Sequence, residues 1–172
     1  REKTFFDDEI VAHVSMAHPT SNGLMNACED AIKKEKIDYQ RNGTYVVMEG
    51  PQFSTLAESN LYRSWKADVI GMTNMPEAKL AREAEIRYAS VSMVTDYDCW
   101  HPDHDAVTVD QVIATLKSNS DKSKSIVVTL SQVNDLCARP CACSEANAYA
   151  KITAEYAQDP ELVSQLQRIL DP

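Results

Sequence analysis

The stretch SVSMVTDYDCW, residues 90–100, is decisive for the fold expected of this chain. It begins as an apolar, β-branched run after a helical stretch, which is typical of a buried strand in a parallel sheet. The run stops at Asp96 and Asp98, which flank an aromatic residue. In open α/β sheets ligands bind beyond the carboxyl ends of such strands, so the two carboxylates are candidates for a functional site. The alternative is an ordinary exit from a strand, where aspartate commonly forms turns.

Segments typical of strands and helices alternate around this run, which predicts an α/β fold. The strand-like runs lie at residues 9–16, 43–48, 67–72 and 88–95. Helices are expected after Ser21, near Glu58, at Pro76 and after Thr108, and amphipathic segments follow at 144–157 and 160–170. The first helix has one apolar stripe, formed by Leu24, Cys28, Ala31 and Ile32. Three or four strands are few for an open sheet with covered faces, so we expect part of a mixed β-sheet flanked by helices.

Composition limits the partners of the chain. A net charge of −9 and a pI near 4.9 argue against nucleic acid or an anionic membrane as the main partner, because both bind clustered basic residues. A small anion in a local pocket of backbone N–H groups and hydroxyls remains compatible with that charge. No apolar run approaches the ~18 residues of a membrane span. The 172 residues suit one domain or part of a larger one, and a start at Arg1 favours a piece of a longer protein.

The five cysteines bear on the compartment and on metal binding. Their odd number, without a recognisable export signal, favours a reducing compartment, so we expect the cytoplasm, with the nucleus as an additional location. Cys137, Cys141 and Cys143 either bind zinc or belong to a flexible surface insertion that carries thiols. The insertion is favoured because a fourth ligand is missing nearby. For His101 and His104 a solvated acidic loop is likewise favoured over a metal site, so no metal is expected.

Three loops follow the strand-like runs at residues 50–55, 71–74 and 95–98. Ser54, Thr55 and Thr73 precede helices, where free N–H groups attract an anion, although for any one of these hydroxyls an N-cap is the favoured explanation. Phe53 either stacks on a flat ligand or packs in the fold. The aspartates either accept hydrogen bonds from a heterocycle or supply a general acid. The residues alone therefore predict an α/β domain that binds a small anionic or heterocyclic ligand.

Three longer motifs carry a resemblance to a known family. They are EGPQFS at residues 49–54, ADVIGMTNMPE at 67–77 and the run that ends in TDYDCW at 95–100. With them, residues 49–130 closely resemble the 5′-methylthioadenosine phosphorylases of the nucleoside phosphorylase superfamily. Residues 1–7 and 13–17 also fit, so the resemblance covers about three quarters of the chain. It implies a pentosyltransferase of purine and methionine salvage that cleaves methylthioadenosine with inorganic phosphate, without a cofactor, to adenine and 5-methylthioribose 1-phosphate.

The resemblance also implies roles at the purine and the phosphate. Asp96 would protonate purine N7 as the glycosidic bond breaks, and Asp98 would hold the 6-amino group and keep Asp96 oriented. The other residues expected to bind substrate on this side are Phe53, the Met72 backbone and Thr95, with Ser54 and Thr73 at the phosphate. Relatives that act on 6-oxopurines resemble this family but have Asn in place of Asp96 and Glu in place of Ser54, so 6-aminopurines are expected here.

At the 5′ side, Val109, Val112 and Ile113 would line an apolar pocket for the methylthio group. Such a pocket discriminates a methylthio from a hydroxyl group by only a few kcal/mol, so adenosine is expected as a slow second substrate. Members of the family are trimers in which a histidine reaches the pocket of the neighbouring subunit, and His13 matches that position. The resemblance therefore implies a homotrimer.

The match has limits at both ends. The N-terminal half of the family's domain, with its phosphate-binding Arg-His pair, is absent, so residues 1–172 represent the C-terminal portion of one domain. We expect them to be unstable and inactive alone and to bind a separate N-terminal fragment of the same protein. Residues 131–172 form a divergent helical segment in which Leu170 is a candidate to close the 5′ pocket. The alternatives are a broader purine nucleoside (adenosine) phosphorylase and a non-catalytic subunit.

Overall fold

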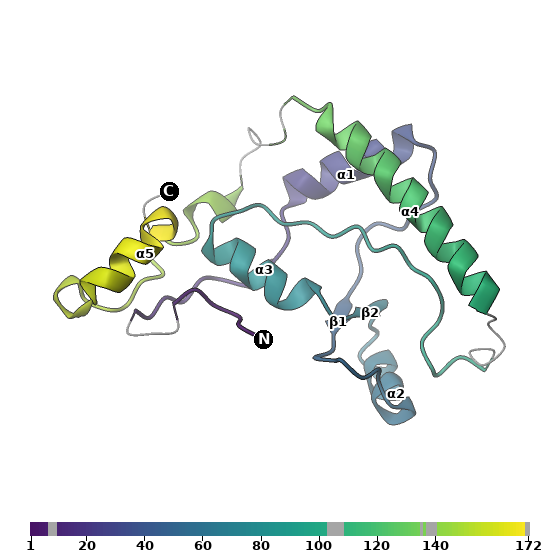
Figure 1. The fold of residues 1–172 in the computed structure, drawn as a ribbon, viewed down its shortest axis with the longest axis horizontal. Helices are drawn as coiled ribbons and strands as arrows, with labels where there is room; N and C mark the ends of the chain where they lie inside the picture. Colours follow the sequence, from purple (N-terminus) through teal and green to yellow (C-terminus); the bar gives the residue numbers. More distant parts are fainter. Residues whose placement is uncertain (7–9, 103–108, 135, 137–140, 171–172) are drawn as a thin grey trace. The chain divides into compact units, whose positions relative to one another are not determined.

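The computed structural model describes residues 1–6, 10–102, 109–134, 136 and 141–170. In chain order the elements are α1 (Asn22–Lys34), β1 (Tyr45–Val47), α2 (Leu56–Ser64), β2 (Val69–Gly71), α3 (Asn74–Glu83), α4 (Val109–Ser131), the 3-10 turns η2 (Ala142–Glu145) and η3 (Glu155–Ala157), and α5 (Pro160–Leu170) (Figure 1). This order confirms the α/β class. None of the described helices is long and apolar enough to cross a membrane.

The chain divides into two compact units, each made of segments distant in sequence. The first contains residues 1–25, 74–90 and 136–172, and the second contains residues 26–73 and 91–135. The second unit contains the sheet and most of the residues proposed for the site, and each unit is described by itself below.

The sheet of the second unit consists of β1 and β2, which pair in parallel with Tyr45 opposite Val69 and Val47 opposite Gly71 (Figure 1). Both strands lie inside the predicted runs 43–48 and 67–72, and α2 connects them. Gly71 lies close to the Tyr45 side chain, since a Cβ atom at Gly71 would lie 1.9 Å from the Tyr45 hydroxyl oxygen and would force the ring or the strand to shift.

α1 and α4 form the apolar core of the second unit. Ala31, Ile32 and Ile126 are buried together, and Ile37 and Leu130 pack against them at the edge. Burying an isoleucine side chain of this kind stabilises a fold by about 1.5–3 kcal/mol. The stripe predicted on the first helix is confirmed, with Ala27 buried beside it.

The first unit packs the N-terminal segment against α5. Phe6, Ile10 and Leu166 are buried in one cluster, and the partly buried side chains of Ala12, Leu162, Val163 and Ile169 surround it. The helix expected after Ser21 is confirmed, and Ser21 caps its first turn, since the Leu24 N–H donates to the Ser21 hydroxyl at 3.4 Å. The extended backbone of Met75 means that the regular part of α3 begins at Pro76, as the sequence indicates.

Two predicted strands are wrong. In residues 10–16 the pairing is limited to an isolated antiparallel bridge between Ala12 and Lys151, and residues 88–95 are irregular in the structure. A strand needs a hydrogen-bonded ladder, and in the described part of the chain neither run has a ladder partner. Val94, expected to be buried, is 62% exposed. The segment 144–157 contains two short 3-10 turns rather than a longer helix, whereas the helix expected at 160–170 is confirmed.

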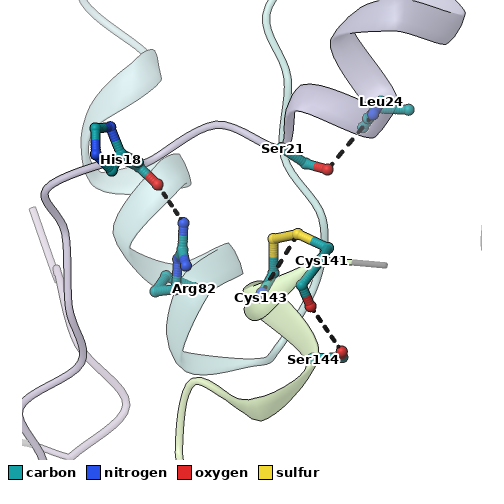
Figure 2. The surroundings of a disulfide bond; sticks show 7 residues. All are labelled: His18, Ser21, Leu24, Arg82, Cys141, Cys143 and Ser144. Carbon is teal, nitrogen blue, oxygen red and sulfur yellow. Dashed lines mark hydrogen bonds between the residues drawn. A yellow bond between two sulfur atoms is a disulfide. The ribbon is translucent and has the colours of Figure 1, made fainter. Parts of the chain in front are cut away.

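The cysteine cluster also differs from its prediction. Cys141 and Cys143 form a disulfide, with Cys143 buried and their Cα atoms 5.1 Å apart, within the ordinary range for such a bond (Figure 2). Free thiols at these two positions are therefore a wrong prediction. Cys137, His104 and Thr108 lie outside the described residues. In the described ranges, no three His, Cys, Asp or Glu side chains gather to hold a metal ion.

Candidate functional site

The site begins where the two parallel strands end. Because β1 and β2 run in the same direction, their carboxyl ends lie at one edge of the sheet. The Met48 N–H donates to the Gly71 carbonyl at 2.9 Å, so the loops that follow the strands leave this edge side by side. The Met72 sulfur lies close to Gly50: a Cβ atom added at Gly50 would lie 2.7 Å from that sulfur. Gly50 has a φ of 68°, which glycine adopts at little cost.

The third predicted loop is tied to the first loop by a hydrogen bond from Cys99, the residue that follows it, and to α2 by a hydrogen bond at Asp98. The Cys99 thiol donates to the Ser54 carbonyl at 3.6 Å, a contact of ordinary length for sulfur. One residue earlier, the Asp98 carboxylate accepts the Cys99 N–H at Oδ1 (2.8 Å) and the Ser59 hydroxyl at Oδ2 (2.6 Å). The three loops predicted to converge are therefore connected within the second unit.

The two aspartates are in different environments. Asp98 is half-buried and each of its oxygens accepts a hydrogen bond, so its orientation is fixed. Asp96 is exposed, and its Oδ1 accepts the hydroxyl of the neighbouring Thr95, which is exposed as well. Asp96 is thus accessible to a ligand, beside a carboxylate that the protein holds in place.

The hydroxyl groups after β1 divide into a cap and a candidate ligand group. Thr55 is the N-cap of α2 in a reciprocal capping box with Glu58, so for Thr55 the structural explanation is confirmed. Hydrogen bonds from the Thr55 backbone and then from its side chain lower the pKa of Glu58. Ser54 is half-buried, and its hydroxyl lies 3.4 Å from the Met48 sulfur, a weak acceptor. Thr73 follows β2 directly and is exposed.

The apolar residues predicted for substrate are largely open to solvent. Phe53 is 84% exposed, which removes packing in the described fold as its explanation. On α4, Val112 is half-buried and Ile113 is 57% exposed, while Val109 begins the helix and its side chain is outside the described part. The Asn119 amide donates to the Val94 carbonyl at 2.9 Å and ties α4 to the segment that leads to Asp96.

The remaining predicted positions belong to the first unit. His13 is exposed, and its backbone N–H donates to the Ala150 carbonyl at 2.8 Å, next to the bridge between Ala12 and Lys151. Leu170 is the last residue of α5, and its side chain is outside the described part.

Two residues of α2 at the site were not predicted from the sequence. Ser59 is 1% exposed and contacts Asp98, and the guanidinium carbon of Arg63 lies 3.8 Å from the centre of the Trp100 ring. Trp100 itself lies edge-on to Tyr97, which stacks on His101 at 4.3 Å. The available signal is their spacing, since residues four apart share one face of a helix.

Comparisons with known proteins identify the family of the chain. A family model described as "Phosphorylase superfamily" matches residues 1–132. The chain belongs to this superfamily. Within the superfamily, it is 52% identical over 173 aligned residues to the S-methyl-5′-thioadenosine phosphorylase of Cereibacter sphaeroides, covering 98% of this chain and 59% of the relative.

Solved structures of the phosphorylase superfamily have the same fold. The methylthioadenosine phosphorylase from an antarctic soil metagenomic library matches with a TM-score of 0.90 and 42% identity, over 99% of this chain and 60% of the other. A variant of the adenosine/methylthioadenosine phosphorylase of Schistosoma mansoni, in complex with methylthioadenosine, matches with a TM-score of 0.71 and 27% identity, over 86% of this chain and 57% of the other. The chain thus spans about three fifths of the length of its relatives.

Proposed function

We propose that this chain provides the purine side of an S-methyl-5′-thioadenosine phosphorylase. The observation that supports this most directly is the fixed Asp98 beside the accessible Asp96, in a loop joined to Ser54 at the carboxyl edge of the sheet. The similarity to the Cereibacter sphaeroides enzyme and to the methylthioadenosine phosphorylase structure supports the reaction and the substrate class.

In the proposed reaction, the bond between ribosyl C1′ and purine N9 breaks, and its electron pair goes to the purine. Asp96, in its protonated form, gives its proton to N7, so that adenine leaves as a neutral molecule. This lowers the barrier because the adenine anion is a poor leaving group. An oxygen of inorganic phosphate, held near Ser54 and Thr73, forms the new bond to C1′. Phosphate is the co-substrate, and no cofactor takes part.

The other predicted residues complete the substrate site in this proposal. Phe53 packs on the purine, Thr95 supports Asp96, and the Met72 backbone contacts the ribose hydroxyls. Their exposure supports contact with a ligand more than a role in the core, most clearly for Phe53 at 84%. The methylthio group lies against apolar residues, namely Val109, Val112 and Ile113.

In this proposal the site also needs a segment of the protein other than residues 1–172. We propose that residues 1–172, including the segment 131–172, form the C-terminal portion of one domain, completed by an N-terminal segment of the same protein. Within the described residues the sheet has two strands with unpaired outer edges, and Val94 is exposed; both observations support a missing neighbour. We also propose a cytoplasmic homotrimer in which His13 of one copy reaches the 5′ pocket of the next. The similarity to the Cereibacter sphaeroides enzyme does not support a nuclear location.

The test is release of adenine from methylthioadenosine with and without inorganic phosphate, together with an intact-mass spectrum of the sample. Phosphate-dependent release, with an N-terminal segment in the spectrum, is the expected result. Phosphate-dependent release by residues 1–172 alone would refute the need for a second segment. No release when both segments are present would refute the enzyme and favour a non-catalytic subunit.

A broader purine nucleoside (adenosine) phosphorylase is the second candidate, because the Schistosoma mansoni neighbour carries both substrates in its name. The proposal for this chain expects a lower kcat/KM with adenosine than with methylthioadenosine, because the 5′ pocket residues are apolar. Equal values for the two substrates would favour the broader enzyme.

A further inference from the structure

Helix α2 provides a rigid base beside the proposed purine site. The Glu58 N–H donates to the Thr55 hydroxyl at 3.2 Å, and the Glu58 carboxylate accepts the Thr55 N–H at 2.7 Å. Ser59 comes next and donates its own N–H to the Thr55 carbonyl at 2.9 Å. Its backbone is therefore fixed by the capped first turn, and at 1% exposure its side chain has little freedom.

The Asp98 carboxylate is held by two donors, one of which is the Ser59 hydroxyl. That hydroxyl donates to Asp98 Oδ2 at 2.6 Å, while the Cys99 N–H donates to Oδ1 at 2.8 Å. Hydrogen bonds to a carboxylate are short and strong compared with those between neutral groups. With one donor on each oxygen, the plane of the carboxylate is set by the protein before any ligand arrives.

A second contact from the same helix face holds the loop beyond Asp98. Arg63, four residues after Ser59, lies over the Trp100 ring at 3.8 Å. α2 therefore contacts the loop at two points separated by one residue, Asp98 and Trp100. The position of the loop follows from the position of the helix.

We propose that Ser59 is a positioning residue for Asp98 and, through Asp98, a determinant of the preference for 6-aminopurines. This inference rests on the proposed function, in which Asp98 holds the 6-amino group. Each Asp98 oxygen accepts one hydrogen bond from the protein and keeps a further lone pair that can accept a hydrogen bond from a ligand. A 6-amino group donates to those lone pairs, whereas a 6-oxo group presents a second acceptor and is repelled.

The test compares Ser59→Ala with the unchanged protein in the assembly that releases adenine. The substrates are methylthioadenosine and its 6-oxo counterpart, methylthioinosine. A hydrogen bond to a charged group corresponds to about a 10- to 100-fold effect. We expect KM for methylthioadenosine to rise by about that factor with a smaller change in kcat, because Asp98 contacts the base before and during the reaction. The preference over methylthioinosine falls in parallel.

Two controls separate positioning from a general loss of structure. Ser64→Ala removes an exposed hydroxyl of the same helix, which donates to the Leu61 carbonyl at 2.7 Å, and leaves both substrates unaffected. In an Asp98→Ala background, Ser59→Ala has little further effect, because the group it positions is gone. If Ser59→Ala does not fold, Ser59→Cys, a weaker donor of similar size, takes its place with an intermediate effect.

The outcomes distinguish this inference from the proposed function. An unchanged protein without phosphate-dependent adenine release would refute the proposed function. Calorimetric binding of adenine to the same variants would still test whether Ser59 orients a purine-binding carboxylate. An active protein in which Ser59→Ala matches Ser64→Ala, or in which the effects of Ser59→Ala and Asp98→Ala add independently, would overturn the positioning role.

Discussion

Replacing Gly71 with alanine tests how the end of β2 is built. The new Cβ would lie 1.9 Å from the Tyr45 hydroxyl oxygen and 2.9 Å from ring atom Cζ. The first distance is about 1.5 Å short of ordinary van der Waals contact. The Tyr45 ring must turn away or the strand must move, and overpacking of this kind costs about 1–3 kcal/mol. For a chain of this length we expect a fall in melting temperature of about 4–8 °C per 2 kcal/mol.

The second background in this experiment is Tyr45→Phe, which removes the closest atom and leaves the milder contact with Cζ. Gly71→Ala should then cost about half as much in the Tyr45→Phe protein as in the unchanged one. Thermal unfolding of the four proteins, each in the complete assembly, gives the coupling between the two positions. An equal cost in both backgrounds would show that the close approach of Tyr45 and Gly71 does not explain the glycine.

Three further predictions concern the reaction, the pH dependence and the core. Asp96→Asn should lower kcat on methylthioadenosine by about 10²–10⁴-fold and shift preference towards 6-oxopurines, and steady-state kinetics that match the unchanged protein would remove Asp96 from the mechanism. Several contacts lower the pKa of Glu29 to about 2, and the hydrogen bond from Lys33 is the largest of them. The ionised Glu29 carboxylate therefore stabilises the fold fully above about 4.3, the ordinary pKa of glutamate, and this stabilisation is lost as pH falls through about 2. Urea unfolding should therefore show a larger difference between Glu29→Gln and the unchanged protein at pH 6 than at pH 2, and a constant difference would contradict the assignment. Ile126→Ala should cost about 2–5 kcal/mol and Val127→Ala, at a 63% exposed position, about 0.5 kcal/mol or less, and similar unfolding midpoints for the two would refute the core between α1 and α4.

The local hydrophobic pattern was sufficient to predict the strands whose pairing strand lies within the described chain. β1 and β2 pair with each other, so the apolar runs 43–48 and 67–72 became strands as expected. The run 88–95 has the same chemistry but lacks a ladder partner in the described residues, and hydrophobic pattern does not report whether a partner exists.

The candidate site was predictable to a similar extent. The loops were found because they follow apolar runs, and the positions of Asp96 and Asp98 were clear from the sequence. Ser59 was not, because its contact with Asp98 spans 39 residues and a serine inside a helix is most often a surface residue. The Cys141–Cys143 pair shows the same limit, since a spacing of two is compatible with a metal site, free thiols or a disulfide.

The capping box at the start of α2 has an electrostatic consequence for phosphate. The positive end of the helix dipole is next to Ser54, but Glu58 places an ionised carboxylate in that same first turn, and hydrogen bonds from Thr55 lower its pKa further. The attraction that a bare helix end offers an anion is therefore largely cancelled by the chain itself. A phosphate dianion near Ser54 needs cationic groups from another segment, so the affinity for phosphate reports whether that segment is present.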